Sequence, residues 1–282
     1  MNYEDNPKSI KYYVKRFLQE NQHNIKGKTI IDFPAGNGIT SRIIKEFGGR
    51  VYPFDLFPDY FKVEGLECKM ASALEGLPVD KNFADILICQ DGIEHFSDQL
   101  KIFKEFSRVI KMHGTLLITT PNYSNLRSKL SFLLTESERF GSTMPPNELD
   151  SIWMSKKEAE TDIYFGHMFL IGVQRLRLFA QLAGFKIKKI YPTKTKSTSV
   201  LLFPFLYPFI VFFNWLTYRK SLGKNNLYSK EIKKNVYKEI FKISIDPKIL
   251  VGSHLMIEFE KEQEVAKVMA NLKCQHKDFG LT

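Results

Sequence analysis

The chain has 282 residues, of which 44% are hydrophobic and 26% are charged. This composition excludes a disordered or fibrous protein, and the length suits one large α/β domain with insertions or two smaller domains. The formal net charge of +10 is unevenly placed, because the segment 186–242 holds 13 basic and two acidic residues and the remainder of the chain nets −1.

The cysteines and histidines give no sign of a disulfide framework or a metal centre. The three cysteines lie far apart without a C-x-x-C pair, which indicates reduced core residues in a cytoplasmic protein. The six histidines form neither H-E-x-x-H nor a Cys/His pair at metal spacing, so we predict no metal site. The polar N-terminal stretch has no apolar signal segment, which also favours the cytoplasm.

The first elements in chain order are an amphipathic helix within 7–22 and a β-α-β unit over 29–55. Apolar residues at 10, 13, 14, 17 and 18 follow the helical period. A short β-rich run at 29–33 is then broken by the turn PAGNG, and apolar positions at helical spacing lead to Gly48 and Gly49. A second strand ends in Asp55, and the crossover between the two parallel strands should be right-handed.

The turn at 34–38 and the acid at the end of the second strand predict a pocket for a cofactor that contains adenosine. Backbone N–H groups at a helix N-terminus can face a carboxylate or a phosphate, and Asp55 can accept hydrogen bonds from both hydroxyls of a ribose. The dinucleotide fingerprint G-x-G-x-x-G is not matched, because Pro34 and Ile39 replace two of its glycines. A nicotinamide-dependent oxidoreductase is therefore disfavoured.

The rest of the chain alternates predicted strands and helices. We expect strands at 67–71, 83–90, 114–120, 185–191 and 252–260, and helices at 97–110, 126–134 and 172–183. The stretch 122–165 is too long for a strand-to-helix connection and is predicted to be a lid or substrate loop.

Several motifs resemble those of class I S-adenosylmethionine-dependent methyltransferases of the type-11 or type-12 kind. Asp32-x-x-Ala35-Gly36-x-Gly38 with Asp55 is similar to the first motif, although the family usually has glycine where this chain has Pro34. The later motifs follow in the same order: Leu77-Pro78, Phe83-Ala84-Asp85, Glu94-His95 and Lys111-Met112-His113-Gly114. The resemblance runs from about Ile10 to Pro192 with a short piece near Ser253. It is nearest to ubiquinone-pathway O-methyltransferases and methyltransferases of surface-glycan clusters.

The resemblance implies a Rossmann-like α/β fold, with a seven-stranded, mostly parallel sheet, helices on both faces and an antiparallel last strand. The methyltransferase domain would comprise 1–191 and 252–262, with the lid at 122–165. An apolar and basic insertion, 192–251, would separate the sixth strand from the seventh, and 263–282 would form a C-terminal tail.

The resemblance also implies S-adenosyl-L-methionine as the cofactor and assigns its binding residues. These are Asp32, Pro34, Ala35, Gly36, Gly38, Asp55, Leu56, Ser72, Ala73 and Gln90. Ser72 stands where relatives usually carry an acid that bonds the adenine amino group, and a hydroxyl accepts that bond more weakly than a carboxylate.

For a hydroxyl acceptor, His95 next to Glu94 is the first choice as general base, because the ordinary pKa of histidine lies near the working pH. A Glu-His pair that only orients the next helix is the structural alternative. The predicted substrate-binding residues are Asn122, Tyr123, Arg127 and His167.

The insertion begins with an apolar run of 14 residues, Val200 to Phe213, which includes Pro204 and Pro208. A spanning helix takes about 20 residues, and two prolines argue against a simple span. Dense aromatic residues followed by basic ones suit the interface of an anionic membrane, so 200–238 is the predicted contact. An apolar hairpin packed on its own sheet or on a second subunit remains the alternative. Nucleic acid is disfavoured, because the run lacks aromatic platforms interleaved with basic residues.

The sequence thus predicts a methyltransferase that O-methylates a lipid-linked or amphipathic acceptor, such as a glycan or a quinone-like molecule. It would act as a peripheral protein on the cytoplasmic membrane face. The alternatives are a methyltransferase for soluble small molecules whose insertion forms a homodimer, and a catalytically silent binding module of the same fold.

Overall fold

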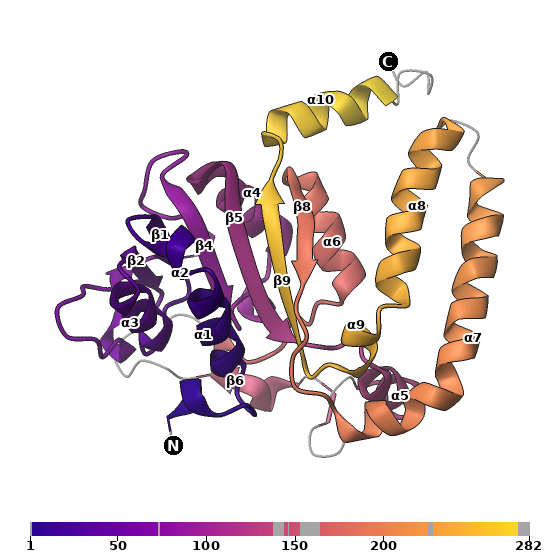
Figure 1. The fold of residues 1–282 in the computed structure, drawn as a ribbon, viewed down its shortest axis with the longest axis horizontal. Helices are drawn as coiled ribbons and strands as arrows, with labels where there is room; N and C mark the ends of the chain where they lie inside the picture. Colours follow the sequence, from indigo (N-terminus) through magenta and orange to yellow (C-terminus); the bar gives the residue numbers. More distant parts are fainter. Residues whose placement is uncertain are drawn as a thin grey trace.

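The centre of the molecule is a seven-stranded sheet with one antiparallel member (Figure 1). The structure is a computed structural model that describes residues 2–72, 74–137, 144–145, 147–152, 164–224 and 228–275. The strands of the sheet are β1 (Thr29–Asp32), β2 (Arg50–Asp55), β3 (Lys69–Met70), β4 (Ala84–Gln90), β5 (Ile110–Pro121), β8 (Phe185–Ile190) and β9 (His254–Lys261). Their order is β3-β2-β1-β4-β5-β9-β8, and β9 alone pairs antiparallel, with β5 on one side and β8 on the other. The predicted Rossmann-like sheet is confirmed.

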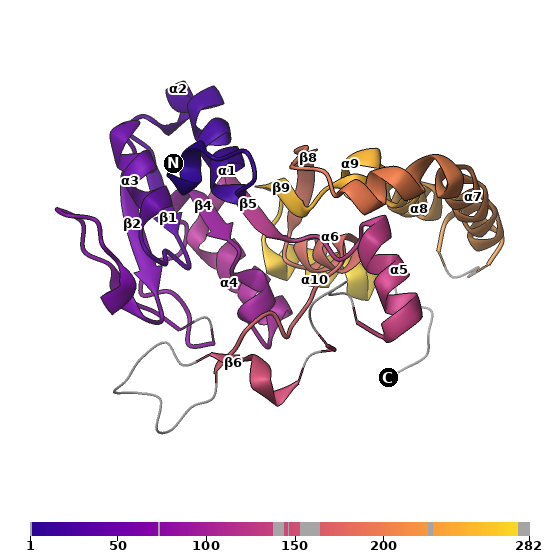
Figure 2. The same cartoon turned by 90° about the horizontal axis from the view of Figure 1, so that it is seen from below.

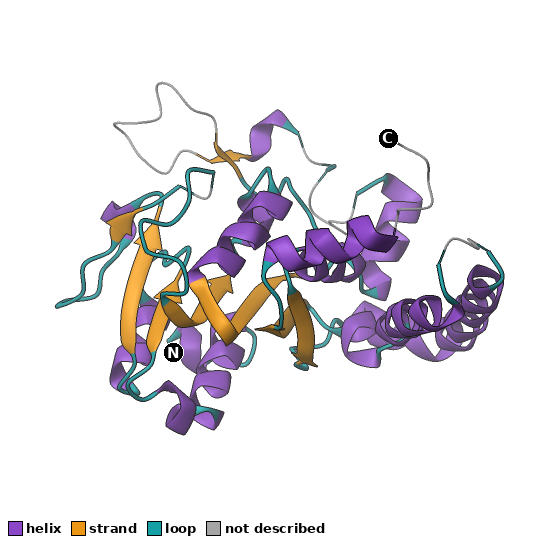
Figure 3. Ribbon diagram, turned by 90° about the horizontal axis from the view of Figure 1, so that it is seen from above, coloured by secondary structure: helices purple, strands orange, loops and turns teal. Residues whose placement is uncertain are grey.

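Helices cover both faces of the sheet, as predicted (Figures 2 and 3). One face packs against α1 (Ile10–Glu20) and α3 (Ile39–Glu46), and the other against α4 (Gln99–Val109) and α6 (Val173–Leu182). Each face has its own apolar core, with Leu18 and Ile43 in the first and Phe103, Phe106 and Leu176 in the second. The remaining elements outside the insertion are α2 (Gln22–Ile25), α5 (Leu126–Thr135), α10 (Val265–Gln275), the pair β6 (Ser151–Ile152) and β7 (Tyr164–Phe165), and short 3-10 turns at Tyr3–Asp5, Pro58–Tyr60, Ile93–His95 and Glu148–Asp150.

One buried cation ties the last strand to the sheet. Lys261 is fully buried, and its Nζ donates to the carbonyls of Ser107 and Ile110 at 2.7 and 2.9 Å. The same ammonium forms an ion pair with Glu264 at 2.9 Å. Buried charges are tolerated when paired and hydrogen-bonded, so this cluster fixes the end of β9 against α4 and β5.

The insertion between β8 and β9 consists of three helices: α7 (Ser197–Leu222), α8 (Lys230–Ser244) and α9 (Pro247–Val251). The two prolines that the sequence analysis weighed against a simple span, Pro204 and Pro208, lie inside α7, which continues for 26 residues. A proline removes one intrahelical hydrogen bond and bends a helix, yet the bonds on either side can persist. Figure 1 shows such a bend between the first part of α7, near α5, and its longer second part, beside α8.

Polar contacts attach these helices to the rest of the domain. On α6, the Arg177 guanidinium pairs with Glu239 of α8, and the Gln174 amide donates to the carbonyl of Ile240 and the hydroxyl of Ser244. At the start of α7, the buried hydroxyl of Ser199 accepts the backbone N–H of Arg127 on α5 at 3.0 Å. The insertion is therefore docked on α5 and α6 at both ends.

Most of α7 nevertheless exposes its apolar side chains. Leu201 and Phe205 are each 69% exposed, and Phe209 is 62% exposed. Within the described ranges, α7 is the one helix long and apolar enough to cross a bilayer by length and composition, with a mean hydropathy of 1.8. The alternative of an apolar hairpin packed on its own sheet does not hold for these side chains.

Candidate active site

The loop between β1 and α3 contains two glycines in left-handed conformations, with φ of +53° at Gly36 and +83° at Gly38. A Cβ on Gly38 would lie 2.5 Å from Cγ2 of Val63, whereas a Cβ on Gly36 would meet nothing within 4 Å. A glycine is thus required at position 38 because a side chain there would collide with Val63. Gly36 instead borders open space that a ligand can occupy. On the other side of the loop, the ring of Pro34 packs directly against Gly92.

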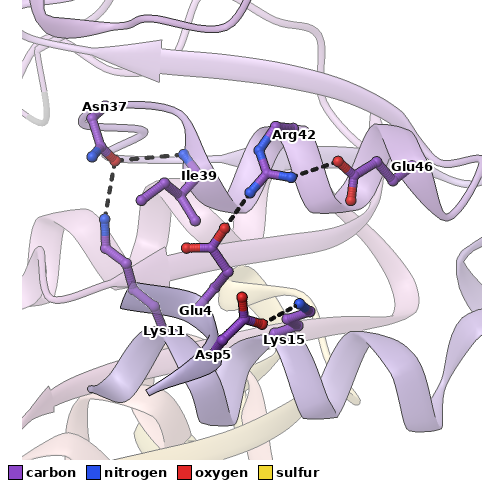
Figure 4. A network of polar contacts seen from close by, with 8 residues as sticks. All are labelled: Glu4, Asp5, Lys11, Lys15, Asn37, Ile39, Arg42 and Glu46. Carbon is purple, nitrogen blue, oxygen red and sulfur yellow. Dashed lines mark hydrogen bonds and ion pairs between the residues drawn. The ribbon is translucent and has the colours of Figure 1, made fainter. Parts of the chain in front are cut away.

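The N-terminal segment holds this loop in place (Figure 4). The side-chain oxygen of Asn37 accepts a hydrogen bond from Lys11 Nζ at 3.0 Å, and the Arg42 guanidinium pairs with both Glu4 and Glu46. Burial lowers the pKa of Lys11, although the carboxylate of Asp32 opposes that shift. The helix α1 therefore supports the loop from the side, an arrangement that favours a preformed ligand site.

The two predicted acidic residues of the loop have different environments. Asp32 is buried and accepts the Ser41 hydroxyl at 2.6 Å, and its burial raises its pKa to about 7. Asp55 accepts the backbone N–H of Gly36 on one oxygen at 2.7 Å and that of Phe57 on the other at 2.8 Å. Each carboxylate oxygen has a second acceptor site, so Asp55 keeps the capacity to accept two ribose hydroxyls. Together with the open space at Gly36, this fits an adenosyl cofactor.

The other predicted cofactor residues lie along the same carboxyl edge. The N–H of Ala35 donates to Phe54 of β2, and Ser72 follows β3, where Ala71 bonds the carbonyl of Asp55. Leu56, half-buried, directly follows Asp55 at the end of β2. Ala73 lies outside the described residues. The Gln90 side chain, at the end of β4, accepts the hydroxyl of Thr40 at 2.8 Å, a partner on α3 that the sequence analysis did not identify.

Beyond β4, a buried acid lies next to two imidazoles. Glu94 is fully buried; its Oε2 accepts the Thr120 hydroxyl at 2.9 Å, while its Oε1 lies 3.9 Å from Nε2 of His167. Oε1 has no hydrogen bond within the described structure, and burial raises the pKa of Glu94 to about 8. The rings of His95 and His167 are 5.2 Å apart. The predicted base and its predicted competitor therefore share one site.

The same three side chains form a set of donors for a metal ion. Glu94, His95 and His167 each place one ligand atom within 4.8 Å of the others. One carboxylate and two imidazoles suit a divalent transition metal. The sequence prediction of no metal site stays a prediction. It rested on linear spacing, which does not reveal a cluster that tertiary folding assembles from two distant segments.

Apart from His167, the predicted substrate residues lie around the loop after β5. The Asn122 amide donates to the carbonyls of Ile249 and Gly252 at 2.7 and 3.0 Å, which gives it a structural role between β5 and the insertion. Tyr123 lines a pocket under α7, and Arg127 lies on α5 beside the start of α7. The sequence analysis assigned no role to His254, at the start of β9. Its Nδ1 lies 3.1 Å from the Ser253 hydroxyl, and burial lowers its pKa.

Comparisons with known proteins agree with this geometry. A family model described as a methyltransferase domain matches residues 4–190. Among similar proteins is the ubiquinone biosynthesis O-methyltransferase of Xanthomonas campestris pv. campestris, 23% identical over 191 residues that cover 61% of this chain and 77% of that protein. The protein of the same name from Hydrogenovibrio crunogenus is 29% identical over 138 residues, 46% of this chain and 53% of its own.

The fold also resembles that of a solved SAM-dependent methyltransferase from Archaeoglobus fulgidus, with a TM-score of 0.51 and 15% identity over 92% of this chain and 98% of that one. The family model spans more than half of the chain, and the sheet order, the open space at Gly36 and the hydrogen bond from Gly36 to Asp55 agree with it. The chain therefore belongs to the methyltransferase domain family and is a class I S-adenosylmethionine-dependent methyltransferase.

Proposed function

We propose that this enzyme methylates an oxygen atom of an amphipathic or lipid-linked acceptor at the cytoplasmic face of a membrane. The observation that carries the proposal is the exposed apolar surface of α7, whose first part lies beside α5 near the carboxyl edge of the sheet (Figure 1). The name of the similar proteins, ubiquinone biosynthesis O-methyltransferase, supports oxygen as the acceptor atom.

The residues along the carboxyl edge of the sheet would have different roles in methyl transfer. When bound, S-adenosylmethionine supplies an activated methyl group, and the protein must align the acceptor and exclude water. Gly36 and Asp55 would hold the cofactor, with Gly36 leaving room for it and Asp55 accepting its ribose hydroxyls. His95 or His167 would take the proton of the acceptor hydroxyl, because a neutral imidazole has one ring nitrogen that can accept it. Glu94, 3.9 Å from His167, would orient that imidazole.

An interfacial position of the insertion agrees with its charges better than a transmembrane one. Seven basic side chains on α7, α8 and the turn between them are exposed: Arg219, Lys220, Lys224, Lys230, Lys234, Lys238 and Lys242. A spanning α7 would draw the lysines of the packed α8 into hydrocarbon, which is costly. At the interface, the aromatic side chains and the basic residues meet lipid and anionic headgroups together. The Arg219 guanidinium already lies over the Trp215 ring at 5.6 Å.

Sedimentation with vesicles of phosphatidylglycerol or phosphatidylcholine, in low and high salt, tests the membrane contact. The protein should bind the anionic vesicles, less so in high salt, and the double variant F205S/F209S should lose most of the binding. The control Y3S/Y60S removes two exposed aromatic rings elsewhere and should bind like the unmodified chain. Absence of binding in both salts, together with a stable dimer in sedimentation equilibrium, would favour the soluble, dimeric alternative.

A turnover screen tests the acceptor class. Methyl transfer should be faster to a long-chain phenol or glycolipid in detergent than to a short, water-soluble analogue with the same hydroxyl. Equal rates with both acceptors would refute the proposal that the acceptor is amphipathic. Absence of cofactor binding in calorimetry would instead favour a catalytically silent module.

A further inference from the structure

A pocket of about 540 Å³ lies under the helical hairpin formed by α7 and α8. We call it the hairpin pocket. It is lined from several directions: Tyr123 and Ser124 from the loop after β5, Lys129 from α5, Arg175 from α6, Asn214 from α7 and Ser244 from α8. Figure 2 shows these helices gathered around one end of the sheet. The volume lies within the range of small-molecule sites.

The polar side of the hairpin pocket is cationic. Lys129 and Arg175 come from different helices, and none of the described residues that line the pocket is acidic. Neither cation has a hydrogen-bond or ion-pair partner in the part of the chain that the structure describes. Lys129 is exposed overall, but partial desolvation lowers the pKa of its ammonium. Two such charges facing one cavity favour an anionic ligand, and an arginine beside a lysine suits phosphate in particular.

Apolar side chains also line the hairpin pocket. They are Leu170, Val173, Ile243 and Ile249, and Asn214 belongs to the same helix as the exposed Phe209 and Phe213. A ligand with an anionic head and an apolar tail would therefore find a partner for each part. The loop that contributes Ser124 starts at the carboxyl end of β5, which is the side of the sheet where the methyl-transfer residues lie.

We propose that the hairpin pocket binds the phosphate group of an amphiphile between Lys129 and Arg175, with the apolar chain directed along α7. This inference rests on the proposed function and adds a phosphate-binding subsite next to its active site. The phosphate has two sources, the acceptor itself or a lipid of the membrane, and both present the same chemistry to the two cations.

Calorimetric titration of the full chain with dodecyl phosphate, below its critical micelle concentration, tests the proposal. The matched neutral probe is dodecyl maltoside, and inorganic phosphate serves as a competitor. We expect dodecyl phosphate to bind, dodecyl maltoside to bind at least about tenfold more weakly, and K129Q or R175Q each to weaken dodecyl phosphate binding by about tenfold. The control K101Q/K104Q removes two exposed lysines of α4, with the same change in net charge as K129Q/R175Q, and should bind like the unmodified chain.

Equal affinity for both amphiphiles, or unchanged affinity in K129Q/R175Q, would overturn the proposal. Vesicles of phosphatidylglycerol separate the two sources of phosphate. If K129Q/R175Q no longer binds the soluble amphiphile but still binds the vesicles, the hairpin pocket binds the phosphate of the acceptor. If the variant binds neither, the pocket binds the phosphate of a membrane lipid. S-adenosylmethionine affinity, measured in the same variants, should be unchanged. If the unmodified chain binds the cofactor and the vesicles but not dodecyl phosphate, the phosphate site in the hairpin pocket is refuted and the proposed function is not.

Discussion

Replacement of Glu94 by glutamine tests the electrostatic state of the candidate active site. Glu94 is fully buried, one of its oxygens has no hydrogen bond within the described residues, and burial raises its pKa from 4.5 to about 8. We therefore expect its carboxyl group to be protonated in the folded protein at neutral pH. Glutamine has nearly the same shape and cannot ionise, so it resembles the protonated acid.

The pH dependence follows from linkage. Between pH 4.5 and 8 the folded chain keeps the proton of Glu94 while the unfolded chain loses it, so stability falls as the pH rises through this window. Each pH unit costs about 1.4 kcal/mol, so the full window corresponds to at most about 5 kcal/mol. Between pH 5.5 and 8.5 the loss should be about 3 kcal/mol. E94Q does not undergo this loss.

Urea unfolding of the unmodified chain and of E94Q at pH 5.5 and 8.5 measures the difference directly. The free energy of unfolding of E94Q, relative to the unmodified chain, should rise by about 3 kcal/mol between the two pH values. The pKa of Asp32 is also raised, but Asp32 is present in both proteins. Its contribution to the pH dependence therefore cancels in the difference between their free energies of unfolding. The control E64Q replaces an exposed acid and should show no such trend. A difference that stays constant with pH would mean that Glu94 is ionised in the folded state, and the reasoning would fail.

Three further substitutions address the cofactor loop and the fold. D55A removes the proposed acceptor of two ribose hydroxyls and should weaken S-adenosylmethionine binding by about 100-fold or more in calorimetry; a loss below threefold would place the ribose elsewhere. G38A forces a Cβ toward Val63 at a φ of +83° and should lower the free energy of unfolding by about 1–3 kcal/mol in urea, whereas an unchanged midpoint would show that the loop relaxes freely. K261M leaves two buried carbonyls without their donor and should cost about 2 kcal/mol or more, so a stability equal to that of the unmodified chain would make the ion pair with Glu264 dispensable.

The parts of the fold that the sequence predicted correctly are those with strong local signals. Strands at 83–90 and 252–260 and helices at 126–134 and 172–183 appear within a few residues of their expected bounds. Each has a clear apolar period and a turn at its end, so local preference and tertiary packing agree. The sequence did not predict the continuous helix α7, because its two prolines were weighed against a simple span. In a long apolar helix the bonds that two prolines remove are few beside those that remain, and the helix bends without ending.

The candidate site likewise has a part that local sequence predicts and a part that only the tertiary fold creates. The turn between β1 and α3 was predictable because its glycines, Asp55 and the following helix lie within one short stretch of chain. The association of His167 with Glu94 was not, since it requires the segment after the lid to return to the end of β4. Thr120 and His254 were given no role for the same reason: a single hydroxyl or imidazole has no sequence pattern. The parallel pairing of β5 with β4 places Thr120 at the carboxyl edge, and the antiparallel pairing of β9 with β5 places His254 there.

The topology itself explains why an insertion at this point can serve the active site. β9 is antiparallel to both β5 and β8, so β8 runs parallel to β5 and ends at the carboxyl edge, and β9 begins there. Any segment inserted between β8 and β9 must leave and re-enter at that edge, and the bridge between Thr195 and Gly252 closes its base. An insertion between α6 and β8 would emerge at the opposite edge, away from Glu94 and Asp55. Because the last strand is reversed, the start of α7 lies at the carboxyl edge of the sheet. This is the edge where ligands of open α/β folds bind, so no longer linker is needed to place α7 beside the active site.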